Sequence, residues 1–168
     1  MRVIAAVLVT AASVFAGVLV RMDLRRRVRV SSEICLLLRE MRLRARLYEP
    51  LDAQITALSQ DAGLAGLTFL SDCSGRCLSG QPLPQAWTSA VRTFARAQRL
   101  PRTTEELLLQ CVPALTAADG GRVDGLLEWY ETRAAQQLAS AAQTDASVGS
   151  LCVRVCGAAG LLLGILIL

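Results

Sequence analysis

The sequence begins, after Met1 and Arg2, with VIAAVLVTAASVFAGVLV at Val3–Val20, a run that contains no charged residue. It closes with LCVRVCGAAGLLLGILIL at Leu151–Leu168, where Arg154 is the single charge. A helix needs about 20 apolar residues to cross the hydrocarbon core of a bilayer. Both runs satisfy this, because Arg154 lies close enough to one end to reach the headgroups. We therefore expect transmembrane helices at residues 1–20 and 149–168.

An arginine cluster follows the first apolar run and consists of Arg21, Arg25, Arg26, Arg27 and Arg29. Positive residues beside a membrane span stay on the cytoplasmic side. The cluster thus predicts that residues 21–148 form a cytoplasmic domain, and it could also bind anionic headgroups or an acidic partner protein. The alternative is a cleaved signal peptide, since Val14-Phe15-Ala16 offers a small-residue cleavage site. The protein would then be a secreted helical binding protein.

Composition limits the chemistry open to this chain. Its 168 residues include no His and six Cys, with a net charge of +4. The spacing Cys73-x-x-x-Cys77 could suggest a metal or redox pair, but a structural zinc needs four ligands and no second pair or His accompanies it. In a reducing compartment no disulfide is expected. We expect neither a metal nor a cofactor.

Enzymatic and nucleic-acid functions have little support in the sequence. It contains no nucleophile–base pair and no glycine-rich loop for phosphates, so we expect neither enzyme activity nor a small-molecule substrate. Nucleic-acid binding is disfavoured, because the excess positive charge is small and no aromatic residues accompany the arginines.

Apolar residues recur at helical spacing along the middle of the chain. The first such stripe comprises Ile34, Leu38, Met41, Ala45 and Tyr48. Neither Pro nor Gly occurs between Gly17 and Pro50, so the first helix is expected to continue into the domain. No stretch alternates with period two over the length of a strand. The fold class is therefore predicted to be all-α, a membrane-anchored helical bundle.

Turn residues divide the rest of the domain. After Pro50 a helix is expected as far as Gly63, and the Gly- and Pro-rich stretch Ser71–Pro84 is predicted to be a loop. Pro84 suits the first turn of the next helix. Thr103 and Glu106 have the spacing of a capping box for a further helix, which Pro113 should kink or end. The longest later helix carries a further apolar stripe: Val123, Leu127, Tyr130, Ala134, Leu138 and Ala141.

Charge is divided between the two ends of the domain. Arg21–Arg46 holds nine Arg and three acidic residues, a net charge of +6. Glu105–Asp145 holds seven acidic residues and two Arg, a net charge of −5. The first and last helices are therefore expected to pack side by side. Exposed ion pairs contribute only about 0–1 kcal/mol each, so the charges would set pairing and register more than stability.

Small residues line one face of each apolar run. Cys152, Cys156, Gly160 and Gly164 follow one another at every fourth residue in the second run. In the first run the corresponding residues are Ala6, Thr10, Ser13 and Gly17. Small residues let helix backbones approach closely in lipid. We expect these faces to pack, within one chain or between chains, and the protein to be oligomeric.

The layout resembles the stage III sporulation protein AB family. The shared features are Ala86-Trp87 opening a helix, Leu115 four residues before Asp119, and the glycine-containing ending Gly157–Leu168. The resemblance implies an F-type platform domain, like that of type II secretion and type IV pilus systems, in the mother-cell membrane facing the forespore. It further implies a channel complex with an ATPase as partner. A platform subunit of a pilus or secretion system unrelated to spores is the alternative.

The loops farthest from the two apolar ends are the expected contact sites for that partner. They are Ser71–Trp87 and Asp119–Asp124, with Trp87, Asp119 and Asp124 as the candidate partner-facing residues.

Overall fold

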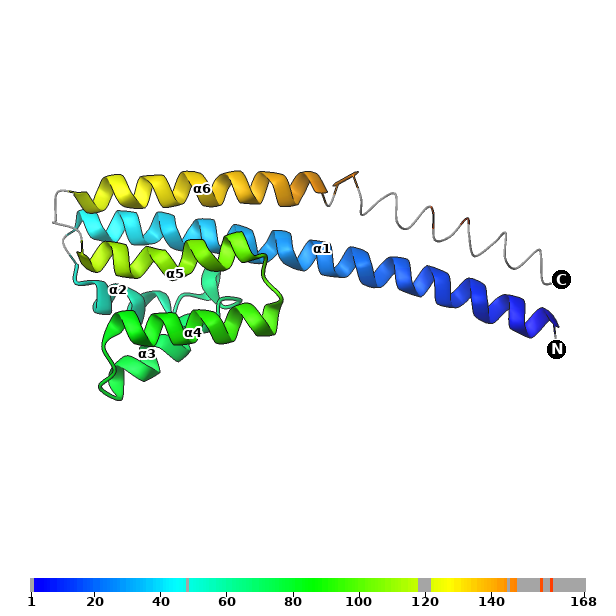
Figure 1. Ribbon diagram of the computed structural model, residues 1–168, viewed down its shortest axis with the longest axis horizontal. Coiled ribbons are helices and arrows are strands. Elements are labelled where there is room, and N and C mark those ends of the chain that lie inside the picture. Colours follow the sequence, from blue (N-terminus) through cyan, green and yellow to red (C-terminus); the bar gives the residue numbers. More distant parts are fainter. Residues whose placement is uncertain are drawn as a thin grey trace. The chain divides into compact units, whose positions relative to one another are not determined.

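The computed structural model describes residues 2–47, 49–117, 122–144 and 146–147, together with Val155 and Ala158. In that part of the chain every regular element is helical, with six α-helices and one 3₁₀ helix (Figure 1). The all-α prediction is confirmed for these residues. The chain divides into two compact units, Met1–Arg29 with Ala139–Leu168, and Val30–Leu138. The second, called the helical unit below, contains the hydrophobic core.

Helix α1 spans Arg2–Arg46 and is the longest element described. This confirms that the first helix continues into the domain, as the absence of Pro and Gly before Pro50 predicts. Within the helical unit its stripe is buried as expected, since Ile34, Leu38 and Met41 are at most 2% exposed. Tyr48, the last member of the predicted stripe, lies outside the described residues.

The expected membrane spans receive no support from the helices themselves. Among the described residues, none of the helices combines the length and the apolar character that a bilayer crossing requires. Residues 149–168 lie outside the described part of the chain apart from Val155 and Ala158. The two spans therefore stay predictions.

The predicted loop at Ser71–Pro84 is largely wrong. After α2 (Leu51–Leu58) and the 3₁₀ helix η1 (Ala62–Leu64), helix α3 covers Phe69–Leu78. Burial explains the difference, because Phe69, Leu70 and Cys73 lie at helical spacing and are at most 1% exposed. The turn comes after α3, where Gly80 has a φ of +91° that L residues rarely adopt.

Glycine is required for close approach at Gly66. A Cβ atom there would overlap the carboxylate of Glu33, which reaches this backbone from α1. The short segment between η1 and α3 can therefore lie directly against the first helix.

Helices α4 (Leu83–Gln98) and α5 (Arg102–Ala117) follow. Pro84 lies in the first turn of α4, as predicted. The capping-box prediction is wrong, because α5 begins at Arg102 and Thr103 is therefore inside its first turn. Pro113 lies within α5, which continues to Ala117 instead of ending there.

Helix α6 (Val123–Thr144) carries the last predicted stripe. Leu127, Tyr130 and Ala134 are buried, which confirms the centre of that stripe. The stripe residues at either end of it are only partly buried.

Trp87 lies at the centre of the core with none of its surface exposed. Its ring meets Phe69 edge-on, with ring centroids 5.1 Å apart and planes at 87°. Its indole N–H donates a 2.7 Å hydrogen bond to the carbonyl oxygen of Leu108. One side chain thus connects α3, α4 and α5, and its polar atom is satisfied.

Replacing Trp87 with Ala should lower the free energy of unfolding by about 3–5 kcal/mol, because it leaves a large cavity and an unpaired carbonyl. Urea denaturation of the full chain in detergent, followed by circular dichroism, measures this loss. Trp129→Ala is the matched control, since Trp129 is 55% exposed, and it should change stability by less than about 1 kcal/mol. Equal losses for the two variants would contradict the assigned core.

Candidate functional site

Oppositely charged side chains join α1 to α6 within the helical unit. Arg42 of α1 is at the centre: Nε lies 3.0 Å from Asp124 Oδ1, Nη2 lies 2.6 Å from Glu128 Oε2, and Nη1 lies 3.2 Å from Glu131 Oε2. Arg46, one turn later, also contacts Asp124 at 3.1 Å. These five residues are called the α1–α6 charge cluster. They confirm that the first and last helices pack side by side with complementary charges.

Electrostatics within this cluster favours the charged form of Asp124. Hydrogen bonds from two arginines lower the pKa of Asp124 from its ordinary value of 3.8 to about 2, and the bond from Arg46 contributes more than the bond from Arg42. The same contact with Asp124 raises the pKa of Arg42. Asp124 and Arg42 therefore stay ionised over the physiological range.

The predicted partner-facing residues do not form one surface. The structure places Trp87 in the core, which corrects the expectation that it faces a partner, because a fully buried side chain cannot be reached. Asp124 is engaged within the chain by Arg42 and Arg46, and whether it also contacts a partner stays a prediction. Asp119 lies outside the described residues.

The predicted basic cluster lies on α1, in the unit that contains Met1–Arg29. Its members are exposed, and Arg27 pairs with Asp23 at 3.1 Å. Of the residues predicted for helix packing in lipid, Gly17 is buried in α1. The others, Cys152, Cys156, Gly160 and Gly164, lie outside the described residues. Roles in topology, lipid binding and packing stay predictions.

The two buried cysteines of the helical unit, Cys73 and Cys111, are poorly suited to nucleophilic chemistry. Cys35, Cys73, Cys77 and Cys111 are all free thiols. Burial raises the pKa of both Cys73 and Cys111 to about 12, so little thiolate exists at neutral pH. Across the described part of the chain, no three His, Cys, Asp or Glu side chains gather as a metal site would require.

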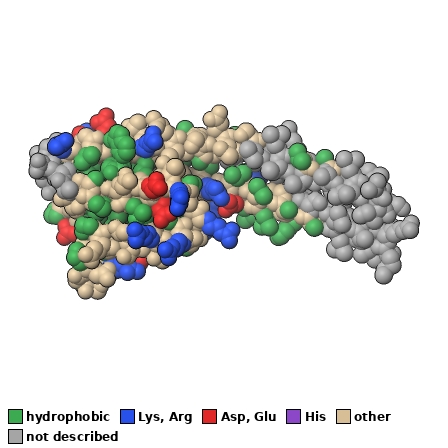
Figure 2. All heavy atoms as spheres, viewed as in Figure 1, with side chains coloured by type: hydrophobic (Ala, Val, Ile, Leu, Met, Phe, Trp, Pro, Cys, Tyr) green, Lys and Arg blue, Asp and Glu red, His purple; other side chains and the backbone are tan. Residues whose placement is uncertain are grey.

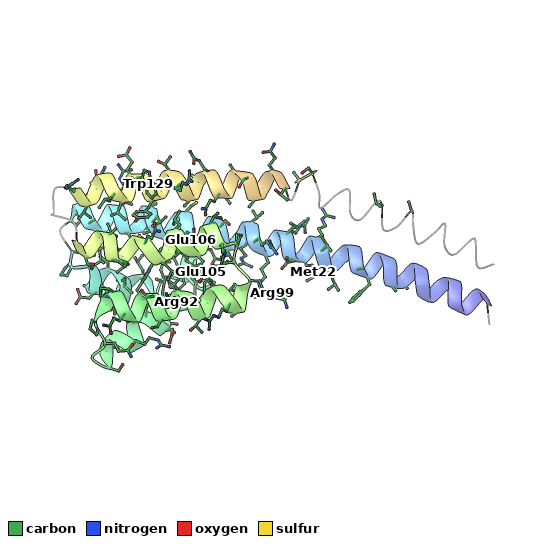
Figure 3. The ribbon with its side chains drawn as sticks, viewed as in Figure 1. Met22, Arg92, Arg99, Glu105, Glu106 and Trp129 are labelled. Atoms are coloured by element: carbon green, nitrogen blue, oxygen red, sulfur yellow. The ribbon has the colours of Figure 1, made fainter. Side chains whose placement is uncertain are left out.

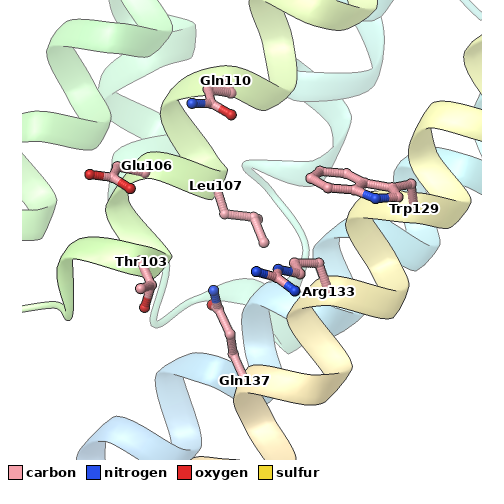
Figure 4. Close-up of a pocket in the computed structure, with 7 residues that line it drawn as sticks. All are labelled: Thr103, Glu106, Leu107, Gln110, Trp129, Arg133 and Gln137. Carbon is pink, nitrogen blue, oxygen red and sulfur yellow. The ribbon is translucent and has the colours of Figure 1, made fainter.

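Sequence reasoning missed a hollow between α5 and α6. It has a volume of about 160 Å³ and lies beside Trp129, with Leu107 of α5 and Arg133 of α6 directed toward it (Figure 4). A signal was present in the sequence, because Trp129 does not belong to the apolar stripe of its helix and must therefore face outward. The structure confirms that Trp129 is exposed, and Figure 3 labels it on α6.

A second feature is a basic surface on α4, away from the helix face that carries Trp87, Val91 and Phe94. Arg92 and Arg96 lie one turn apart on a helix without acidic residues, Arg99 directly follows the helix end, and all three are exposed. Figure 2 shows basic side chains gathered on this face of the helical unit. Arg99 has a φ of 51°, in the left-handed region. It is the only non-glycine residue with a positive φ in the described part of the chain.

Comparison with known proteins places the chain in a family. The family model for stage III sporulation protein AB matches residues 2–168. The chain belongs to the stage III sporulation protein AB family. Neither the curated proteins nor the solved structures give a match.

Membership of the stage III sporulation protein AB family makes this a sporulation-related protein. The family is not one of known enzymes, and its match covers both apolar ends as well as the helical unit. The resemblance inferred from Ala86-Trp87 and the glycine-containing ending is thereby confirmed.

The low pKa of Asp124 predicts how stability depends on pH. A carboxyl group with a depressed folded-state pKa stabilises the fold above its ordinary pKa, and this contribution is lost as pH falls from about 4 toward 2. Asp124→Asn should therefore be less stable than the native chain at pH 7, and the difference in melting temperature should narrow over that acidic window. Thermal melts from pH 7 to pH 2.5 measure this. A difference that stays constant with pH would contradict the ionic role of Asp124.

Proposed function

We propose that this chain is a membrane-anchored, non-enzymatic platform component of the sporulation-specific secretion-like channel between mother cell and forespore. In this proposal its helical unit docks the ATPase of that complex from the cytoplasmic side of the mother-cell membrane. The observation that carries the proposal is the family match over residues 2–168, which includes both apolar ends.

The chemistry of the helical unit supports a mechanical role. Its buried thiols have raised pKa values, and the Asp124 carboxylate is held in ion pairs with Arg42 and Arg46. Such groups stabilise a fold more readily than they perform proton transfer or nucleophilic attack. A helical domain of this kind is suited to transmitting the movement of a bound partner to neighbours in the membrane.

The apolar ends supply the proposed anchors. Residues 1–20 and 149–168 would cross the membrane, and the arginines from Arg21 to Arg29 would hold the domain on the cytoplasmic side. The small residues Gly17, Gly160 and Gly164, with Cys152 and Cys156, would let the anchors pack in an oligomer. The secreted-protein alternative places the helical unit on the opposite side of the membrane.

A cysteine at position 78 tests the orientation, because Leu78 is 84% exposed at the end of α3. Intact cells that produce Leu78→Cys should not react with a membrane-impermeant maleimide, whereas permeabilised cells should. Maleimide labelling of the native chain, which has six cysteines, measures the background signal. Labelling of Leu78→Cys in intact cells at the permeabilised level would exclude the cytoplasmic platform and favour the secreted protein.

A further inference from the structure

The hollow between α5 and α6 belongs wholly to the helical unit. Its lining residues are Thr103, Glu106, Leu107 and Gln110 from α5, and Trp129, Arg133 and Gln137 from α6. Thr104 donates a 3.1 Å hydrogen bond to Oε1 of Gln137 and so ties the two helices together beside the hollow. Leu107 is 5% exposed and contributes the buried apolar part of the lining. The hollow therefore lies beside a direct hydrogen bond between α5 and α6.

Trp129 gives the hollow an exposed aromatic wall. Its ring meets Tyr130 edge-on, with ring centroids 4.9 Å apart and planes at 82°. This contact orients the indole while more than half of the side chain stays exposed. Trp is the residue type most enriched among the energetic centres of protein interfaces, together with Tyr and Arg. An oriented, exposed Trp beside a hollow therefore indicates a docking surface.

Two charges of opposite sign lie at the rim, and both lack an ion pair in the described part of the chain. Arg133 follows Trp129 by one helical turn on α6, and Glu106 lies on α5 and projects away from α6 (Figure 4). Arg42, by contrast, contacts three carboxylates on the same helix α6. Arg133 and Glu106 thus remain available for a partner with the complementary arrangement of charges.

The size of the hollow decides what kind of group it receives. Sites for drug-sized ligands have volumes of about 300–1,000 Å³, which exceeds the 160 Å³ found here. A cavity of about 150 Å³ accommodates a molecule the size of benzene. The hollow therefore has room for one side chain and not for a nucleotide, and Leu107 and Trp129 supply the apolar contacts within an otherwise polar lining.

We propose that the α5–α6 hollow receives an apolar side chain from an amphipathic segment of the ATPase, which carries an acidic residue opposite Arg133 and a basic residue opposite Glu106. The inference rests on the proposed function, which supplies the ATPase as partner. It adds the place of contact and the residues that recognise the partner. Trp129 and Leu107 contact the apolar side chain, and Arg133 sets the direction of the segment.

Binding of the purified companion ATPase to the full chain in nanodiscs tests this inference. Trp129→Ala should weaken binding by about 30-fold, the loss typical of the centre of an interface. Arg133→Glu should weaken it by at least about tenfold, because it sets two acidic groups against each other. Both residues are exposed, so the variants should keep the helical circular dichroism of the native chain.

Two matched controls separate the hollow from the rest of the surface. Leu43→Ala removes a large exposed apolar side chain from α1, and Arg92→Glu reverses an exposed charge on α4 that has no ion pair in the described part of the chain. Each should change the affinity by less than about twofold. The α5–α6 site is wrong if the ATPase binds Trp129→Ala and Arg133→Glu as tightly as it binds the native chain. It is also wrong if the two control variants weaken ATPase binding equally. In both cases the platform function stands. If the ATPase does not bind the native chain, the proposed docking function itself fails.

Discussion

The contact between Arg42 of α1 and the acidic face of α6 is the interaction that determines how the first and last helices of the helical unit are aligned. It joins segments more than 80 residues apart in the chain, and three carboxylates meet a single guanidinium. Arg42 is only partly exposed, so its charge is less screened than that of an isolated surface pair. The apolar stripes supply most of the energy, whereas the charges determine how α6 is aligned along α1. Because α6 forms one wall of the hollow beside Trp129, that alignment also positions the proposed docking site.

Much of this arrangement could be predicted from the sequence, because it depends on periodicity and charge. The uninterrupted run before Pro50 predicts the length of α1, and the basic and acidic ends predict its pairing with α6. The error at α3 has a physical cause. Gly75 and Gly80 predicted a loop, but the burial of Phe69 and Cys73 at helical spacing stabilises a helix instead.

The candidate site was less predictable, because a hollow depends on how two helices pack. No local pattern shows that Leu107 and Arg133 meet across α5 and α6. Trp87 was assigned to a partner surface because of its place near a predicted loop, although it shares a helix face with Val91 and Phe94, which are buried. Trp129, by contrast, lies outside the apolar stripe of α6, and this position predicts an exposed side chain. In this chain, an aromatic residue outside the helical stripe was the better indicator of an exposed site.

The most direct test of this account compares two arginines on the same helix. Arg42→Met removes the central cation of the α1–α6 charge cluster and keeps much of its apolar stem, whereas Arg39→Met does the same at an exposed arginine without an ion pair in the described part of the chain. Urea denaturation of the full chain at low and high salt should show a clear loss of stability for Arg42→Met, smaller at high salt, and almost no change for Arg39→Met. Equal stability of the two variants at low salt would contradict the central role of the α1–α6 contact.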